Sequence, residues 1–491
     1  MSLSPLIVTG SDELTKDDSR SSDDGGGGGG GGGGWRLGWF VEVEEAKAQA
    51  AFSVPMIVSN MSYYGIPLVS VMFAGHLGDL ELAGATLGNS WFTVTGIALL
   101  IGLSGALETL CGQAYGAKSY NMLGIYLQSS LIISSIFAIL VSILWCFTEP
   151  LLIWLHQEPQ VAAMAALYLR YLIPGLFAYG FIQCMLRFCQ TQSVVNPLIF
   201  FSLLPLVLHV GLAFLLVRVV GLGFIGTSLS ASVSLWVSLI MLATYVTVSK
   251  KFEETWGGIR LEAFQHVQSC MRLALPSAVM VCFEYWAFEF LVLLAGLLPN
   301  SERSTSLIAM CVNTESISYM ITYGFSAAVS TRVSNEIGCG NIKKAKNAVS
   351  VTLKLSLFLA ATVVLLLGIG HGFWASLFSS NTEIITQFGG MTLLLTLSIL
   401  FDSAQGVLSG VARGCGWQHL AAWTNLVAFY LIGMPLAFLF AFKMNLMIKG
   451  LWLGLICGLG CQASTLLLIS LRTKWERIEL SLSNTQAHSL V

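Results

Sequence analysis

Residues 102–116 of this chain read GLSGALETLCGQAYG, and residues 324–338 read GFSAAVSTRVSNEIG. A shift of 222 residues superimposes the two stretches and pairs Gly102, Ser104, Ala106, Thr109 and Gly116 with Gly324, Ser326, Ala328, Thr331 and Gly338. Hydrophobicity alone would not produce identities at glycine and hydroxyl positions, so the agreement indicates an internal repeat.

The repeat extends on both sides of these stretches. At a shift of 221 it pairs Pro55, Ala74, Gly75 and Leu77 with Pro276, Ala295, Gly296 and Leu298. At a shift of 226 it pairs Gly180, Arg187, Cys189 and Gln192 with Gly406, Arg413, Cys415 and Gln418. Small gaps in loops account for the drift, and the chain therefore consists of two related halves.

The composition indicates a membrane protein, because 55% of the 491 residues are hydrophobic and only 10% are charged, against about 25% charged in soluble domains. Apolar stretches long enough to cross about 30 Å of hydrocarbon recur near residues 50–73, 83–106, 123–147, 162–184, 198–217, 225–248, 273–298, 306–329, 347–370, 388–410, 420–442 and 449–471. Runs this long can satisfy their backbone groups in a bilayer only as helices. The sequence predicts an all-α membrane protein with twelve transmembrane helices.

Six helices in each half bring both halves into the membrane from the same side. The predicted architecture is two six-helix bundles related by a pseudo-twofold axis along the membrane normal, with a cleft between them that opens alternately to either side. The predicted segments are a disordered acidic and Gly-rich tail (1–45), the first bundle (46–249), a linker with an amphipathic helix (250–271), the second bundle (272–473) and a C-terminal tail (474–491).

The positions of lysine and arginine predict that both termini are cytoplasmic. The inner loops and ends would then hold Lys118, Arg187, Lys250, Lys251, Arg260, Arg272, Arg332, Lys343, Lys344, Lys346, Lys354, Arg413, Arg472, Lys474 and Arg477. The outer side would hold only Arg170, Arg218, Arg303, Lys443 and Lys449.

Ionisable groups within membrane helices are the candidates for chemistry, because a charge at mid-bilayer costs about 2.5–3.5 kcal/mol or more. The acids in the predicted spans of the second half are Glu284, Glu289, Glu315 and Asp402. Glu284 would lie roughly 16 Å and Asp402 roughly 12 Å from the inner helix ends, depths that are compatible with one shared site. Two neighbouring buried carboxyl groups can take up and release a proton near neutral pH. Glu289 lies on another face of its helix from Glu284.

The sequence around Glu284, with Leu275-Pro276-Ser277-Ala278 before it and Cys282-Phe283-Glu284-Tyr285-Trp286 and Glu289 around it, resembles plant-type multidrug and toxic compound extrusion (MATE) transporters. Supporting runs are LETLCGQAYGA (107–117), STRVSNEIG (330–338) and GVARGCGWQ (410–418). The resemblance covers about residues 45–475. It implies antiport of organic cations, alkaloids, flavonoids or other xenobiotics against protons or sodium, with Glu284 and Asp402 at the positions of the coupling acids.

The resemblance also favours protons over sodium. Bacterial relatives often carry an aspartate in the first helix, where this chain has Asn60, Ser62, Tyr63 and Tyr64. We therefore expect cation coupling through Glu284, Asp402 and Glu289. Sodium coupling and a major-facilitator-type carrier, which also has twelve helices, are the alternatives.

Polar and aromatic residues within the spans are candidates for contacts with substrate in the cleft, because aromatic faces attract organic cations. They are Asn60, Tyr64, Asn89, Trp91, Asn313, Tyr319, Gln405 and Asn425.

Other functional classes find little support. The net charge of −2 does not favour nucleic acid, and the eleven cysteines form no CxxC pair. We expect no cofactor, no metal site and no enzymatic activity. The expected partners are a small organic substrate, protons and the lipid bilayer of the plasma or vacuolar membrane, around a monomer.

Overall fold

The computed structural model describes residues 43–299, 301–378, 381–472 and 475. These residues form helices joined by short turns, and no strand occurs among them. Most of the two predicted tails lies outside the described residues. The first helix begins at Val43, so residues 43–45 belong to a helix and not to the tail.

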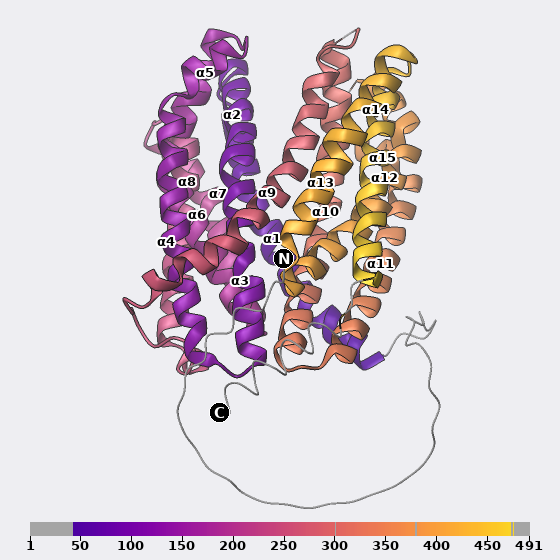
Figure 1. Ribbon diagram of the computed structural model, residues 1–491. Helices are drawn as coiled ribbons and strands as arrows, with labels where there is room; N and C mark the ends of the chain where they lie inside the picture. Colours follow the sequence, from indigo (N-terminus) through magenta and orange to yellow (C-terminus); the bar gives the residue numbers. More distant parts are fainter. Residues whose placement is uncertain (1–42, 300, 379–380, 473–474, 476–491) are drawn as a thin grey trace, which may run out of the picture.

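The first half contains six membrane-spanning segments (Figure 1). Its helices are α1 (Val43–Gly75), α2 (Asp79–Phe92), α3 (Ala98–Gly116), α4 (Tyr120–Cys146), the short α5 (Thr148–Trp154), α6 (Pro159–Thr191), α7 (Asn196–Phe214) and α8 (Phe224–Val248). A π-helical turn at Thr93–Ile97 joins α2 to α3, and another at Leu215–Val219 extends α7. These wider turns keep each span continuous.

The second half repeats this pattern after a single turn of 3₁₀ helix at Lys250–Phe252. Its helices are α9 (Ala263–Ala295), α10 (Ser301–Gly338), α11 (Ile342–Ser376), α12 (Thr382–Cys415), α13 (Gln418–Asn425), α14 (Met434–Phe438) and α15 (Met447–Arg472). Wider turns at Leu426–Gly433 and Leu439–Lys443 make one continuous span of α13 and α14.

Eleven spans in the described part of the chain are both long and apolar enough to cross a membrane, and α10 is the twelfth long helix. α10 is less apolar because it carries many Ser, Thr and Asn residues. It can carry them because it packs against α1, α3, α9, α11 and α12 rather than standing alone in lipid. The prediction of twelve helices in two bundles is confirmed.

The prediction of a separate amphipathic helix in the linker is wrong, because this segment is continuous with the first membrane helix of the second half. Residues 263–271 are the first turns of α9, because no proline or glycine interrupts the helical pattern before Pro276. Val267 and Met271 pack against the core of the first bundle, while Phe264 is 64% exposed. Farther along, Leu291 belongs to the core of the second bundle, so α9 passes from one bundle to the other.

The two bundles diverge toward the top of Figure 1 and approach one another toward its bottom. At the lower end α3 packs against α9, α10 and α12. The approach is close because a Cβ on Gly116 would lie 2.0 Å from the backbone oxygen of Asn335, and one on Gly338 would lie 2.2 Å from that of Gln113. Gly116 and Gly338 are equivalent in the repeat, and we call the end of the molecule that they occupy the closed end.

Candidate functional site

Two predicted coupling acids, Glu284 of α9 and Asp402 of α12, are joined by one amide. The Nε2 atom of Gln405 donates to Glu284 Oε1 at 3.0 Å and to Asp402 Oδ1 at 2.8 Å. All three side chains are buried. Asp402 and Gln405 are three residues apart on α12, which places them on one face of the helix toward α9. The structure therefore brings together the two acids that sequence depth placed in one site.

Glu315 of α10 extends this acid cluster. Its charge and that of Asp402 lie close enough to interact. Glu315 Oε2 accepts a hydrogen bond from Ser398 Oγ at 2.7 Å, and Ser398 Oγ also accepts from Trp452 Nε1 at 3.1 Å. Glu315 Oε1 is buried and has no hydrogen-bond partner among the described residues. We use the term acid cluster for Glu284, Glu315 and Asp402.

A chain of amides supports the cluster from the other side. Gln462 lies beside Glu284, and its Nε2 donates to Asn425 Oδ1 at 2.8 Å. Asn425 Nδ2 in turn donates to the backbone oxygen of Met280 at 2.8 Å, one turn before Glu284 on α9. Gln405 and Asn425, which the sequence offered as substrate contacts, are fully buried and hold other polar groups instead.

Glu289 lies apart from the acid cluster. It is partly buried on α9, and no hydrogen bond or ion pair within the described residues connects it to the three clustered acids. The five-residue spacing from Glu284 explains the separation, because it turns the side chain well away around the helix.

Tyrosines from both halves lie next to the acid cluster. Tyr319 of α10 is close to Glu284 and Asp402, and it packs against Tyr323 with ring centroids 5.9 Å apart. Tyr285 of α9 lies near Tyr64 of α1 and Tyr179 of α6, which belong to the other half. Tyr64 and Tyr319 were predicted from the sequence, whereas the other three tyrosines were not. Tyr285 could have been found from its place directly after Glu284.

The remaining predicted cleft residues occupy three different surroundings. Asn60 Nδ2, Asn89 Oδ1 and Trp91 Nε1 are buried polar atoms without a hydrogen-bond partner among the described residues. Trp91 packs against the core of the first bundle. Asn313 is exposed on α10. These four residues are not gathered around the acid cluster by any contact that the structure records.

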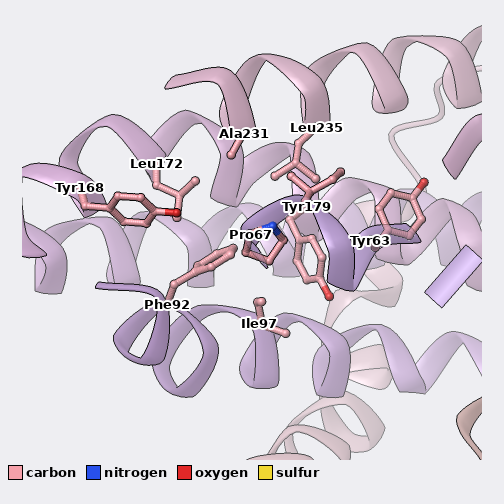
Figure 2. A pocket seen from close by; sticks show the side chains of 10 residues that line it. Tyr63, Pro67, Phe92, Ile97, Tyr168, Leu172, Tyr179, Ala231 and Leu235 are labelled. Atoms are coloured by element: carbon pink, nitrogen blue, oxygen red, sulfur yellow. The ribbon is translucent and has the colours of Figure 1, made fainter. Parts of the chain in front are cut away.

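A small pocket lies within the first bundle (Figure 2). Figure 2 shows side chains from several helices around it, with the rings of Phe92, Tyr168 and Tyr179 close to Pro67. Its volume of about 10 Å³ is about what one water molecule needs. The Tyr168 hydroxyl is buried and has no hydrogen-bond partner in the part of the chain that the structure describes. The pocket is too small for an organic substrate in this conformation.

A second polar cluster lies near the closed end. Glu108 of α3 is completely buried between Arg187 of α6 and Arg413 of α12. Arg413 Nε donates to Glu108 Oε2 at 2.9 Å, and Arg187 Nη1 lies 3.1 Å from Glu108 Oε1. Tyr323 of α10 accepts a hydrogen bond from Arg187, and both guanidinium groups face its ring. We use the term arginine cluster for Glu108, Arg187 and Arg413.

The arginine cluster was not predicted from the sequence, because Arg187 and Arg413 were assigned to inner loops. Both arginines lie inside long helices that continue past the apolar stretch. Glu108 was not considered because it follows the end of the second apolar stretch of its half, residues 83–106. The signal that could have found them is the repeat itself, which pairs Arg187 with Arg413 in two GxxxxxxRxCxxQ matches.

Further contacts join the two halves around the arginine cluster. Gln190 Nε2 of α6 donates to Thr331 Oγ1 of α10 at 3.1 Å, and Gln418 Nε2 donates to Thr109 Oγ1 at 2.7 Å. Thr109 Oγ1 also donates to the backbone oxygen of Arg413. Nearer the rim, Arg332 Nη2 lies 3.1 Å from Glu45 Oε2. The closed end is thus sealed by polar contacts as well as by glycine packing.

Two related helical bundles, with buried acids on α9, α10 and α12 of the second bundle, are typical of a secondary transporter. A family profile described as MatE matches residues 55–215 and 276–439. Protein DETOXIFICATION 18 of Arabidopsis thaliana is 59% identical over 438 residues, which cover 89% of this chain and 93% of that protein. Protein DETOXIFICATION 16 of the same plant is 43% identical over 433 residues, covering 88% of this chain and 89% of the relative.

Solved structures agree with these relatives. The crystal structure of the eukaryotic MATE transporter AtDTX14 superimposes with a TM-score of 0.87 at 37% identity, covering 90% of this chain and 99% of that one. An outward-facing multidrug resistance MATE family transporter of the MOP superfamily gives a TM-score of 0.78 at 20% identity over 89% of this chain and 96% of that one, and it supports the fold alone.

The chain belongs to the MatE family. It is therefore an integral, multi-pass membrane transporter rather than an enzyme, and it is an efflux antiporter for small organic compounds. This membership confirms the resemblance seen in the sequence. It also excludes the major-facilitator alternative.

Proposed function

We propose that the protein exports small organic molecules from the cytosol in exchange for protons. Its substrates are organic cations, alkaloids, flavonoids or other xenobiotics, and it works by alternating access of the region between the two bundles. The observation that carries the proposal is the single amide of Gln405 between Glu284 and Asp402, which links the protonation of one acid to that of the other.

Proton binding is supported by weak charge compensation in the acid cluster, because Arg413 acts on Glu284 only from a distance and pairs with Glu108 instead. Within the described residues, Glu284, Glu315 and Asp402 make no ion pair. Burying an unpaired carboxylate costs several kcal/mol, and neighbouring carboxylates repel one another, so the three cannot all be ionised together. The unpartnered Oε1 of Glu315 also suits a carboxyl group that carries a proton. This arrangement supports proton exchange by these acids.

Sodium coupling is the second candidate, and the acid cluster favours it less. Hard cations take oxygen ligands, whereas Gln405 presents its NH₂ group to both carboxylates. The N–H donors would have to turn away before a cation could bind between the two acids. Glu289 is a further coupling candidate that would act separately from the cluster.

The substrate would lie against the tyrosines that connect the halves. Tyr285 and Tyr319 lie close to Glu284, and Tyr64 of the other half lies near Tyr285. An aromatic surface beside an anionic group attracts organic cations. Asn60, Asn89, Trp91 and Asn313 are additional contact candidates for other stages of transport.

The positive-inside rule supports an orientation in which the closed end faces the cytosol, with both chain termini on that side. The bundles then diverge toward the outside or the vacuolar lumen (Figure 1). One monomer contains both bundles and the complete acid cluster, so the proposed function needs no second subunit. The host membrane would be the plasma membrane or the vacuolar membrane.

The proton gradient can drive export of the substrate against its own concentration gradient. A gradient of about one pH unit supplies about 1.4 kcal/mol, and a potential of about 100 mV supplies about 2.3 kcal/mol. Together they sustain roughly a 500-fold substrate gradient for each proton exchanged.

Proteoliposomes with an imposed pH difference test the coupling ion. We expect a fluorescent organic cation to move toward the acidic side against its gradient, because proton release on the other side resets the acid cluster. The same uptake should occur with sodium replaced by N-methylglucamine. Uptake that needs a sodium gradient and ignores the pH difference would contradict proton coupling. Liposomes without protein provide the control for passive dye movement.

A further inference from the structure

The arginine cluster is built around the symmetry of the repeat, yet it is not symmetric in charge. Arg187 and Arg413 are equivalent positions at a shift of 226, and they approach Glu108 from the two halves. The position equivalent to Glu108 at a shift of 222 is Ser330. The single carboxylate of Glu108 therefore pairs with the two equivalent guanidinium groups of Arg187 and Arg413.

Two polar groups at the cluster lack well-formed hydrogen bonds to described residues at the place where a second acid would lie. The Ser330 hydroxyl is buried beside Glu108, and it makes no hydrogen bond of good geometry within the described part of the chain. Arg187 Nε is also buried without a partner among the described residues. The cluster thus holds one excess positive charge in a site closed to water, where an unpaired charge is costly. In an open conformation water would solvate that charge, so the imbalance favours opening.

One of the two ion pairs of Glu108, the pair with Arg413, crosses the boundary between the halves. Glu108 and Arg187 belong to the first half, whereas Arg413 and Tyr323 belong to the second. The pair between Arg413 Nε and Glu108 Oε2 at 2.9 Å and the bond from Arg187 to Tyr323 both have to break before the closed end can open. Neither bond is made to a residue of the acid cluster, and the charge of Arg413 acts on Glu284 only through space, so the contacts of this site are distinct from those of the proposed coupling acids.

We propose that the arginine cluster is the latch that holds the closed end shut, and that its single acid keeps the latch reversible. The idea rests on alternating access as part of the proposed function. Glu108 is then a positioning residue for transport, with no contact to substrate or coupling proton. A second acid at Ser330 would overstabilise the closed end, and moving the acid from one repeat to the other would preserve the latch.

Cysteine labelling at Ser334 tests the latch without using transport. Ser334 is buried on α10, and its Oγ would lie 1.9 Å from a Cβ on Gly112 of the other half, so only opening exposes it. The parent is the full chain carrying Ser334→Cys, with the exposed Cys146, Cys339 and Cys457 replaced by serine. The same chain without Ser334→Cys gives the background. The measurement is the rate of maleimide labelling.

We expect Glu108→Ser to speed labelling at least about tenfold, because removing one partner of a buried ion pair leaves unpaired charges. Adding Ser330→Glu to Glu108→Ser should return the rate to within about twofold of the parent, because both arginines can reach the repeat-equivalent acid. Ser330→Glu alone should slow labelling and slow substrate turnover together. Glu383→Gln, which removes the exposed Arg303–Glu383 pair within the second half, is the matched control and should leave the rate unchanged.

A double variant that labels as fast as Glu108→Ser would overturn the latch, since it would show that only the native position matters. Unchanged labelling in Glu108→Ser would overturn it as well. If Glu108→Ser does not accumulate as folded protein, Ser330→Glu decides the question, and unaltered labelling there refutes the proposal. The labelling rate is measured without pH-driven transport. The experiment can therefore refute the latch without refuting proton coupling, and the transport assay can refute proton coupling without refuting the latch.

Discussion

Replacing Glu284 with glutamine should reduce pH-driven export to the background level of empty liposomes. Glutamine keeps the size of the side chain and can still bond to Gln405, but it cannot exchange a proton. The same result is expected for Asp402→Asn, which leaves the amide bridge in place and removes the second acid. Export in proteoliposomes at equal amounts of folded protein measures the effect.

Glu289→Gln is the comparison variant on the same helix. Because Glu289 is not connected to the acid cluster, its replacement should cost less transport than Glu284→Gln. An equal loss would extend the coupling machinery to Glu289. Undiminished transport in both Glu284→Gln and Asp402→Asn would remove these acids from the mechanism.

A single methyl group at the closed end should also impair transport strongly. In Gly116→Ala the new Cβ would lie 2.0 Å from the Asn335 backbone oxygen, so the two halves must separate there. Such overpacking costs about 1–3 kcal/mol, which lowers the ratio of sealed to open conformations by about 5- to 150-fold. Substrate export should fall accordingly, and the cysteine placed at Ser334 should label faster.

Gly370→Ala on α11 provides the matched control, because its Cβ meets no atom within 4 Å. Alanine is the better helix former by about 1 kcal/mol, so this variant should keep full transport and unfold no earlier than the parent. Normal transport in Gly116→Ala would show that the close approach of the halves is not needed for function.

The sequence predicted the bundles well because both of its signals are local. Apolar stretches report spans one at a time, and the repeat around Gly102 and Gly324 relates the halves without any knowledge of contacts. The proximity of Glu284 and Asp402 could also be predicted, because the depth of a residue along a helix follows from counting residues. Their joint contact with Gln405 was not, since it depends on how α9 and α12 are rotated.

The arginine cluster escaped prediction for a different physical reason. Hydropathy ends a span at the first charge, and it therefore placed Arg187 and Arg413 in loops. A buried arginine is tolerated only if an acid pairs with it. For Arg413 this acid, Glu108, lies on a helix of the other half, and for Arg187 it lies on a distant helix of the same half. Only a three-dimensional arrangement reveals that Glu108 satisfies both.

The polar character of α10 bears on how the chain is made. Ser301–Gly338 is less apolar than the other eleven spans of the described residues. A segment of this kind partitions poorly into lipid by itself, because its hydroxyl and acidic groups lack partners there. We expect α10 to remain near the insertion machinery during synthesis until α11 or α12 emerges to shield it. In truncated nascent chains ending after α10, a glycosylation tag should report incomplete insertion, and chains extended through α12 should insert fully.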